Sequence, residues 1–122
     1  MLKGDLYNIK QFQYSNELLK AEIVLNEKHA IFKGHFPDIP VLPGVIMMQM
    51  VKELLGEVEG RPMQIAKSGN MKFLQMINPQ KSPLLLFEIK IIEKTKDAIR
   101  IKAQMIDKEI ICFKITAQLS FV

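Results

Sequence analysis

The amino-acid sequence predicts an α+β protein in which an antiparallel sheet wraps around one long central helix. Two observations lead to this class. Residues 45–55 are apolar enough, and long enough, for a buried helix. Extended segments lie on both sides of them. The last of these, residues 110–121, has apolar side chains at odd positions from 111 and mostly polar ones between them. One helix layer packed against one sheet layer satisfies both observations.

Two strands are predicted before the helix. Residues 6–14 and 18–26 read as strands around a polar turn at residues 15–16, and the alternation is clearer in the second strand. Residues 29–32 are expected to continue as a short extended piece. The chain then enters a corner rich in proline and glycine, residues 34–44, which leads directly into the helix.

The helix is expected over residues 45–55. Pro43 fits a first helical turn, where its missing N–H costs nothing, and Gly56 is a plausible residue to end the helix. The first two turns are apolar on every side, through Val45, Ile46, Met47, Met48, Met50 and Val51. Such a helix is expected to be buried all round.

Four extended segments are predicted after the helix. The first covers residues 63–77 and is interrupted by a turn at residues 68–70. The others cover residues 84–93, 98–106 and 110–121, with tight turns between them. Strands in this order form a long antiparallel meander.

Composition limits the class of protein. The 122 residues fit a single domain, 1–122, and a hydrophobic share of 48% is enough for a packed core. No apolar run approaches the roughly 18 residues of a membrane span, and the first residues do not resemble a leader peptide. The single cysteine, Cys112, excludes an internal disulfide. We therefore expect a cytoplasmic protein without a membrane span.

The charge of the chain is mildly positive. The formal net charge is +4, and the lysines between positions 67 and 114 mostly alternate with apolar residues, as on the solvated face of a sheet. The sequence has no tryptophan and no stripe of basic and aromatic residues, so a nucleic-acid partner is not expected. An acidic protein partner remains compatible with this charge.

His35 is the first candidate for chemistry. Gly34 and Pro37 restrict the backbone on either side, so the imidazole is held in place. The segment leads to a helix N-terminus, whose free N–H groups and positive dipole end suit a developing oxyanion. A base of near-neutral pKa beside such a site can remove a proton next to a thioester carbonyl. The alternative is an ordinary loop histidine.

Gln49 and Glu53 are two further candidates, one helical turn apart on the same face. A polar side chain within an apolar helix must find hydrogen-bond partners or cost about 1–3 kcal/mol. For Gln49 the alternative is a bond to a backbone carbonyl across the core, and for Glu53 it is a solvated charge at the helix end. His29, His35 and Cys112 do not have the spacing of metal ligands, so neither a metal nor a cofactor is expected.

The stretch from Gly34 to Val45, Gly-His-Phe-Pro-x-x-Pro-Val-Leu-Pro-Gly-Val, resembles the signature of the β-hydroxyacyl-acyl-carrier-protein dehydratases of fatty acid synthesis. The later Met-Lys-Phe-Leu at 71–74, followed by Asn78 and Pro79, resembles the segment that leads into the last three strands of that family. The likeness therefore covers nearly the whole chain. It implies the hotdog fold, a long helix wrapped by an antiparallel sheet, in agreement with the pattern above.

The resemblance also implies roles for particular residues. His35 would remove the C2 proton of a 3-hydroxyacyl thioester, the Val41 carbonyl would orient the imidazole, and the Gly44 N–H would hold the thioester oxygen. Contacts to the acyl chain would come from Phe36, Pro37, Pro43, Val45 and Met48. In the family a helix acid from the other subunit completes the site, which implies a homodimer and allows a higher assembly of dimers.

The chain departs from the family pattern at the two helix positions. The family places Glu or Asp fourteen residues after the histidine and glutamine one turn later, whereas this chain has Gln49 and then Glu53. We expect Gln49 to hold the β-hydroxyl and Glu53, with a pKa raised by burial near Met50 and Leu54, to supply the proton. The alternative is that Gln49 leaves the site slow or inactive, because an amide is not an acid.

Three functions are compatible with these residues. The leading one is dehydration of 3-hydroxyacyl thioesters on an acyl carrier protein to trans-2-enoyl thioesters, in fatty acid or related polyene or lipid biosynthesis. A non-catalytic acyl-binding subunit of a heteromeric dehydratase is the second, and Gln49 favours it. A hotdog acyl thioesterase is the third, and the dehydratase-type corner at 34–44 argues against it.

Overall fold

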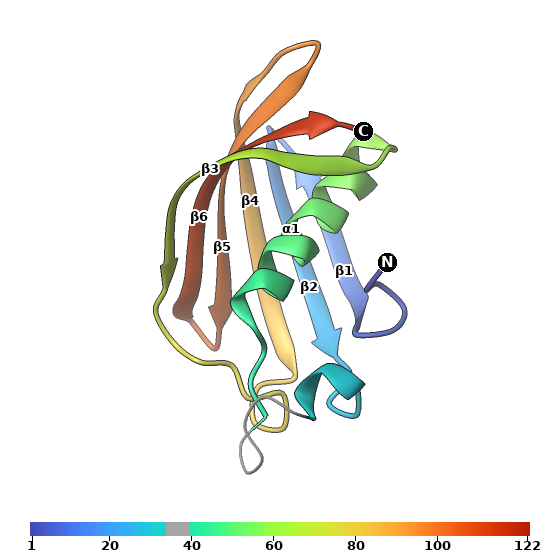
Figure 1. The fold of residues 1–122 in the computed structure, drawn as a ribbon, viewed down its shortest axis with the longest axis vertical. Helices are drawn as coiled ribbons and strands as arrows, with labels where there is room; N and C mark the ends of the chain where they lie inside the picture. The colour runs from blue at the N-terminus through green and yellow to red at the C-terminus, as the bar shows by residue number, and fades with distance from the viewer. Residues whose placement is uncertain (34–39) are drawn as a thin grey trace.

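A computed structural model describes residues 1–33 and 40–122 of the chain. Helix α1 (Gly44–Glu59) lies across one face of a six-stranded antiparallel sheet (Figure 1). The strands are β1 (Tyr7–Ser15), β2 (Leu18–Leu25), β3 (Met63–Phe73), β4 (Leu84–Lys94), β5 (Ala98–Asp107) and β6 (Ile110–Phe121). Their order in the sheet is β1-β2-β4-β5-β6-β3, so β1 and β3 form the edges. The predicted α+β architecture is confirmed.

Two of the predicted hairpins close through pairs of left-handed residues. Asn16 and Glu17 (φ 51° and 63°) join β1 to β2, and Lys108 and Glu109 (φ 48° and 71°) join β5 to β6. Two consecutive left-handed residues match the twist of the flanking strands. The first turn is therefore centred one residue later than the predicted 15–16.

The segment before the corner is not extended, as was expected, but forms a short 3₁₀ helix, η1 (Ala30–Phe32). His29 precedes it as the N-cap, and its Nδ1 accepts a hydrogen bond from the Ile31 N–H at 3.0 Å. The His29 Nε2 lies 2.9 Å from Asp5 Oδ2. A side chain that caps its own turn competes with strand formation, which accounts for the difference.

Helix α1 is longer than predicted. It passes through Gly56 and ends at Gly60, which has φ 71° and donates its N–H to the Gly56 carbonyl at 2.8 Å. Gly56 allows the chain after the helix to approach closely, because a β-carbon there would lie 3.1 Å from the Arg61 carbonyl oxygen. At the other end Pro43 is the N-cap, just before the helix rather than in its first turn.

The prediction that the first turns of α1 are buried all round is wrong for this chain alone. Met47, Met50 and Val51 are buried against the sheet, whereas Val45 is 71% exposed. Three apolar side chains at and just after the end of β3 are exposed as well: Phe73, Leu74 and Met76. The Phe73 ring packs so closely on Gly44 that a β-carbon there would clash with it. The start of α1 and the end of β3 thus share an exposed apolar surface.

Strand β3 runs without a turn through residues 68–70, contrary to the prediction, and ends at Phe73 rather than at residue 77. Its pairing with β6 shifts register between Ser68 and Met71. Thr116 lies so close to Gly69 that its hydroxyl oxygen would clash with a β-carbon there, and the Asn70 N–H donates to that oxygen at 3.1 Å. The interruption seen in the sequence is an irregularity within a strand, where glycine allows close approach.

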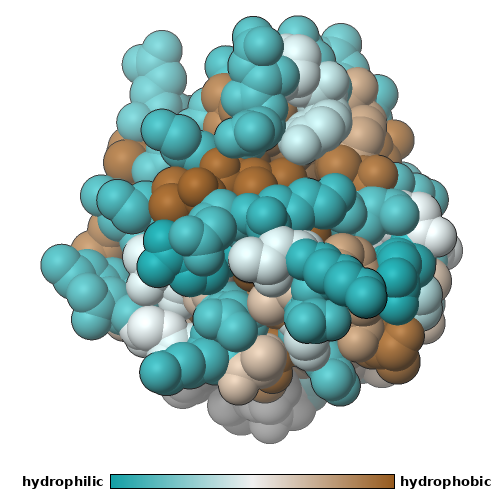
Figure 2. Space-filling view, turned by 90° about the horizontal axis from the view of Figure 1, so that it is seen from above, coloured by the Kyte–Doolittle hydropathy of each residue, from teal (hydrophilic) through white to brown (hydrophobic). Residues whose placement is uncertain are grey.

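Strand β6 alternates as predicted, with Phe113, Ile115 and Leu119 in the core. Cys112 is also fully buried, although the pattern placed it on the wet face. The pairing with β5 shifts register at this point, and such a bulge brings two successive side chains to one side. Seen from the end that carries the C-terminus, apolar side chains form a band between hydrophilic ones (Figure 2). No helix among the described residues could cross a membrane.

Candidate functional site

The corner that the sequence singled out is described only in part. His35, Phe36 and Pro37 lie outside the described residues. The chain is described again from residue 40, and the Leu42 N–H donates to the Ile77 carbonyl at 2.9 Å, which ties the approach of α1 to the segment after β3. Val41 is half-buried at this point.

The N-terminus of α1 has no side-chain cap among the described residues. Its first two intrahelical bonds run from the N–H groups of Ile46 and Met47 to the Pro43 carbonyl, at 3.1 and 3.3 Å. The N–H groups before these point out of the helix, and the helix dipole places partial positive charge there. Gly44 lies at this end with Phe73 against it. This end of α1 therefore suits a partly negative oxygen.

Gln49 is half-buried, and its amide is held at both ends by side chains of the same helix. Its Nε2 donates to Glu53 Oε2 at 3.0 Å, and its Oε1 accepts from Lys52 Nζ at 3.1 Å. The alternative of a bond to a backbone carbonyl across the core is therefore wrong. One N–H of the amide remains after these bonds, because a primary amide carries two.

Glu53 is a buried charged residue, at 8% exposure. Its Oε1 accepts from the Lys3 N–H at 3.0 Å and from the Tyr7 hydroxyl at 3.1 Å. Its Oε2 accepts from the Leu2 N–H at 2.9 Å and from Gln49. Glu53 is therefore not a solvated charge at the helix end. It anchors the N-terminal backbone to the helix.

The expectation of a raised pKa for Glu53 is also wrong. Burial, the largest single influence, raises the pKa of this carboxyl, but the hydrogen bonds from Leu2, Gln49, Lys3 and Tyr7 together outweigh it and lower the pKa. The Tyr7 pKa is raised, by burial and by the negative charge of Glu53, so the phenol stays a donor. Glu53 is ionised at neutral pH and is not poised as a proton donor.

Gln49 and Glu53 line one hollow of about 430 Å³. The helix side of this hollow also includes Lys52, and the opposite side is formed by the N-terminal residue and the segment after α1, through Met1, Arg61, Pro62 and Met63. Its size is in the range of small-molecule sites. Pro43, Val45 and Met48, expected on the wall of the acyl tunnel, do not line it. The structure thus places Gln49 and Glu53 in one hollow, and the expected tunnel residues at the start of the helix lie outside that hollow.

The sequence analysis missed the partners of Glu53. Tyr7 is 1% exposed on β1, and its hydroxyl, like the two backbone N–H groups before it, lies about fifty positions from Glu53 in the chain. A tyrosine within an apolar strand carries a weak signal, because a buried phenol needs a polar partner. Nothing in the sequence indicates which partner that is.

Comparisons of the sequence with known proteins find dehydratases. The family model for the ApeI dehydratase matches residues 10–114. The 3-hydroxyacyl-acyl-carrier-protein dehydratase FabZ of Latilactobacillus sakei is 30% identical over 115 residues, covering 86% of this chain and 76% of that protein. The FabZ of Novosphingobium aromaticivorans is 25% identical over 111 residues, covering 87% of this chain and 69% of that protein.

Solved structures share the fold. The dehydratase heterocomplex ApeI:P from Xenorhabdus doucetiae matches with a TM-score of 0.72 at 18% identity, covering 92% of this chain and 96% of that one. A putative thioesterase from Ralstonia eutropha matches with a TM-score of 0.68 at 15% identity, covering 96% and 86%. Likeness at these identities concerns the fold alone, and it confirms the predicted hotdog architecture.

Proposed function

The chain belongs to the ApeI-like dehydratase family, and from this we propose that it removes water from 3-hydroxyacyl thioesters carried on an acyl carrier protein, giving trans-2-enoyl thioesters. The observation that carries the proposal is the family match over residues 10–114, together with relatives whose names state this reaction. The pathway would be fatty acid or related polyene or lipid biosynthesis. Thioesterases resemble the chain only in fold, which gives no support to hydrolysis.

In the proposed reaction His35 acts as the base. It takes the proton from C2, and the electron pair left behind is delocalised onto the thioester oxygen as an enolate. The Gly44 N–H at the start of α1 would hold that oxygen, because the first N–H groups of a helix are free to donate and the dipole favours negative charge. The Val41 carbonyl would orient the imidazole. The C3–O bond then breaks as the C2–C3 double bond forms.

The departing hydroxide needs a proton, and we assign its return to His35 rather than to Glu53. An ionised carboxylate cannot donate, and the bonds to Glu53 favour its ionised form. A protonated imidazole can give back the proton that it took, so that one group serves as base and then as acid. In a dimer, Gln49 of the second copy would hold the leaving oxygen with its remaining N–H, as the helix acid of the family comes from the other subunit. Glu53 would be a positioning residue that fixes the Gln49 amide.

A second function deserves a test beside this one. Gln49 occupies the place where the family carries a carboxylate, and the ApeI protein of the solved neighbour is part of a dehydratase heterocomplex. The chain would then be the acyl-binding subunit of a heteromeric dehydratase, with the acid supplied by the other subunit.

We further propose that two copies of the chain form a dimer. Val45, Phe73, Leu74 and Met76 expose apolar surface around the start of α1 and the end of β3. Strand β3 is an edge of the sheet, and no other strand among the described residues pairs with its outer side. A partner copy on this edge would cover both the apolar side chains and the free strand edge.

The experiment that tests the function is direct. Purified chain is incubated with a 3-hydroxyacyl carrier protein, and mass spectrometry follows loss of water or release of free acid. Loss of water supports the dehydratase, and free acid supports hydrolysis. If neither appears with the chain alone but water is lost after a second dehydratase subunit is added, the acyl-binding role is supported instead.

A further inference from the structure

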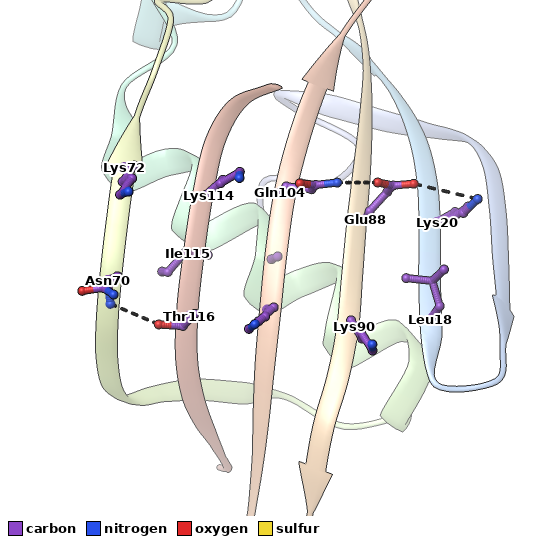
Figure 3. Close-up of a pocket in the computed structure, with 12 residues that line it drawn as sticks. Leu18, Lys20, Asn70, Lys72, Glu88, Lys90, Gln104, Lys114, Ile115 and Thr116 are labelled. Carbon is purple, nitrogen blue, oxygen red and sulfur yellow. Dashed lines mark hydrogen bonds and ion pairs between the residues drawn. The ribbon is translucent and has the colours of Figure 1, made fainter. Parts of the chain in front are cut away.

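The outer face of the sheet, opposite α1, presents a concentration of positive charge. Five exposed lysines point outward from it: Lys20, Lys72, Lys90, Lys102 and Lys114. We call this surface the lysine groove, because the five side chains line a hollow of about 590 Å³ that crosses β3, β6, β5, β4 and β2 (Figure 3). The groove lies on the other side of the sheet from Gln49 and Glu53, and no residue lines both hollows.

The strand register sets lysines directly opposite one another. Lys72 on β3 faces Lys114 on β6, and Lys90 on β4 faces Lys102 on β5. Like charges directly opposite on neighbouring strands destabilise a sheet. None of the ion pairs among the described residues involves these four lysines. The two pairs lie in neighbouring rows of the sheet, because Lys114 faces Gln104 and Lys102 faces Thr116 on the strands between them. A face under selection for stability alone would alternate its charges instead.

One carboxylate lies among the lysines and is already engaged. Glu88 accepts a hydrogen bond from Gln104 Nε2 at 2.6 Å, and its other oxygen lies 3.8 Å from Lys20 Nζ (Figure 3). A second hollow of about 390 Å³ adjoins the groove, sharing Lys102 and Thr116, and adds Lys67 and Arg100 to its walls. The positive surface thus continues along the sheet toward the irregular part of β3.

From these observations we propose that the lysine groove binds an acidic surface of a partner protein. A second copy of the chain in the same orientation is disfavoured, because its groove would carry the same charges. The groove spans five strands, about 19 Å at the usual strand spacing, which is the scale of a protein contact. The proposal concerns a different face of the sheet and does not depend on the reaction proposed above.

The side chains of the groove favour a protein over a nucleic acid. The residues that line the two hollows include no aromatic side chain on which a base could stack, and a single arginine. Glu88 on β4, within the groove, would repel a continuous phosphate backbone. Gln104, Asn70 and Thr116 can both donate and accept hydrogen bonds, which suits the mixed polarity of a protein surface.

The test compares two charge-matched variants of the whole chain. A fluorescein-labelled glutamate-rich peptide is titrated with each protein by fluorescence anisotropy, at low ionic strength and at about 0.3 M salt. We expect Lys72→Glu/Lys114→Glu to weaken binding by about tenfold or more and to flatten its salt dependence. Lys28→Glu/Lys96→Glu has the same net charge at exposed sites away from the groove and should bind like the parent.

Three results would overturn the proposal: no binding at low salt, equal weakening in both variants, or tighter binding of single-stranded DNA or anionic lipid vesicles that the groove variant loses. Turnover of a small 3-hydroxyacyl thioester without a carrier protein serves as the check on the active site, and the groove variant should keep the parent rate. An inactive parent would count against the proposed reaction but would leave the peptide titration fully informative.

Discussion

The substitution Glu53→Gln tests whether the buried carboxylate is an anchor. The change keeps the shape of the side chain but replaces one oxygen by an NH₂ group. Each carboxylate oxygen accepts two hydrogen bonds, from Lys3 and Tyr7 at Oε1 and from Leu2 and Gln49 at Oε2. An amide at this position can keep one of these pairs of donors, and the other pair would face a donor instead.

The magnitude follows from the two donors that lose their acceptor. A buried donor left without a partner costs about 1–3 kcal/mol, so two such donors are expected to lower the free energy of unfolding by about 2–6 kcal/mol. Urea denaturation followed by circular dichroism measures this loss. Glu57→Gln is the matched control one turn along the helix, because Glu57 pairs with Lys3 at an exposed site and should lose less than about 1 kcal/mol.

Two results would refute the anchoring argument. The first is a Glu53→Gln variant whose unfolding free energy lies within about 0.5 kcal/mol of the parent, the range of ordinary surface changes. The second is a variant of normal stability whose rate profile loses its high-pH limb, because that limb would then report a proton donated by Glu53 itself.

Three further predictions concern pH, catalysis and assembly. The Glu53 pKa is lowered in the folded chain, so its contribution to stability is complete above the unfolded value of about 4.3 and is lost as pH falls further; the gap between parent and Glu53→Gln in urea should therefore shrink in acid. His35→Ala should abolish loss of water in the mass-spectrometric assay while the circular dichroism spectrum stays that of the parent, and near-normal turnover would remove His35 as the base. Met76→Lys should place a charge on the exposed apolar surface and shift sedimentation from dimer to monomer, whereas a parent that sediments as a monomer would contradict the dimer.

The fold was predictable where its signals are local. Alternating apolar and polar residues predicted the strands of the meander, and an apolar stretch after the proline-rich corner predicted the helix. The helix end was misplaced because Gly56 and Gly60 look alike in sequence, yet one permits close approach of Arg61 and the other ends the helix. The exposure of Val45 was not predictable, since a sequence does not show whether an apolar side chain is buried within its own chain or against a partner chain.

The candidate site was predictable in its members but not in its electrostatics. Sequence spacing placed Gln49 and Glu53 one turn apart, and the structure has them 3.0 Å apart in a hydrogen bond. The direction of the Glu53 pKa depends on donors at Leu2, Lys3 and Tyr7, which are distant in the chain and, for two of them, are backbone groups that any residue would provide. A sequence pattern cannot report such partners.

The anchored carboxylate constrains how this chain can change by mutation. Positions 49 and 53 are joined by a hydrogen bond, so substitutions there are expected to be non-additive. Replacing Gln49 by Glu first would place two carboxylates next to each other. Replacing Glu53 by Gln first would remove hydrogen bonds that hold the N-terminal backbone. Either order of single steps toward the usual family arrangement passes through a weakened intermediate. Single random mutations are therefore expected to restore the family arrangement only slowly, and Gln49 and Glu53 are expected to be retained together.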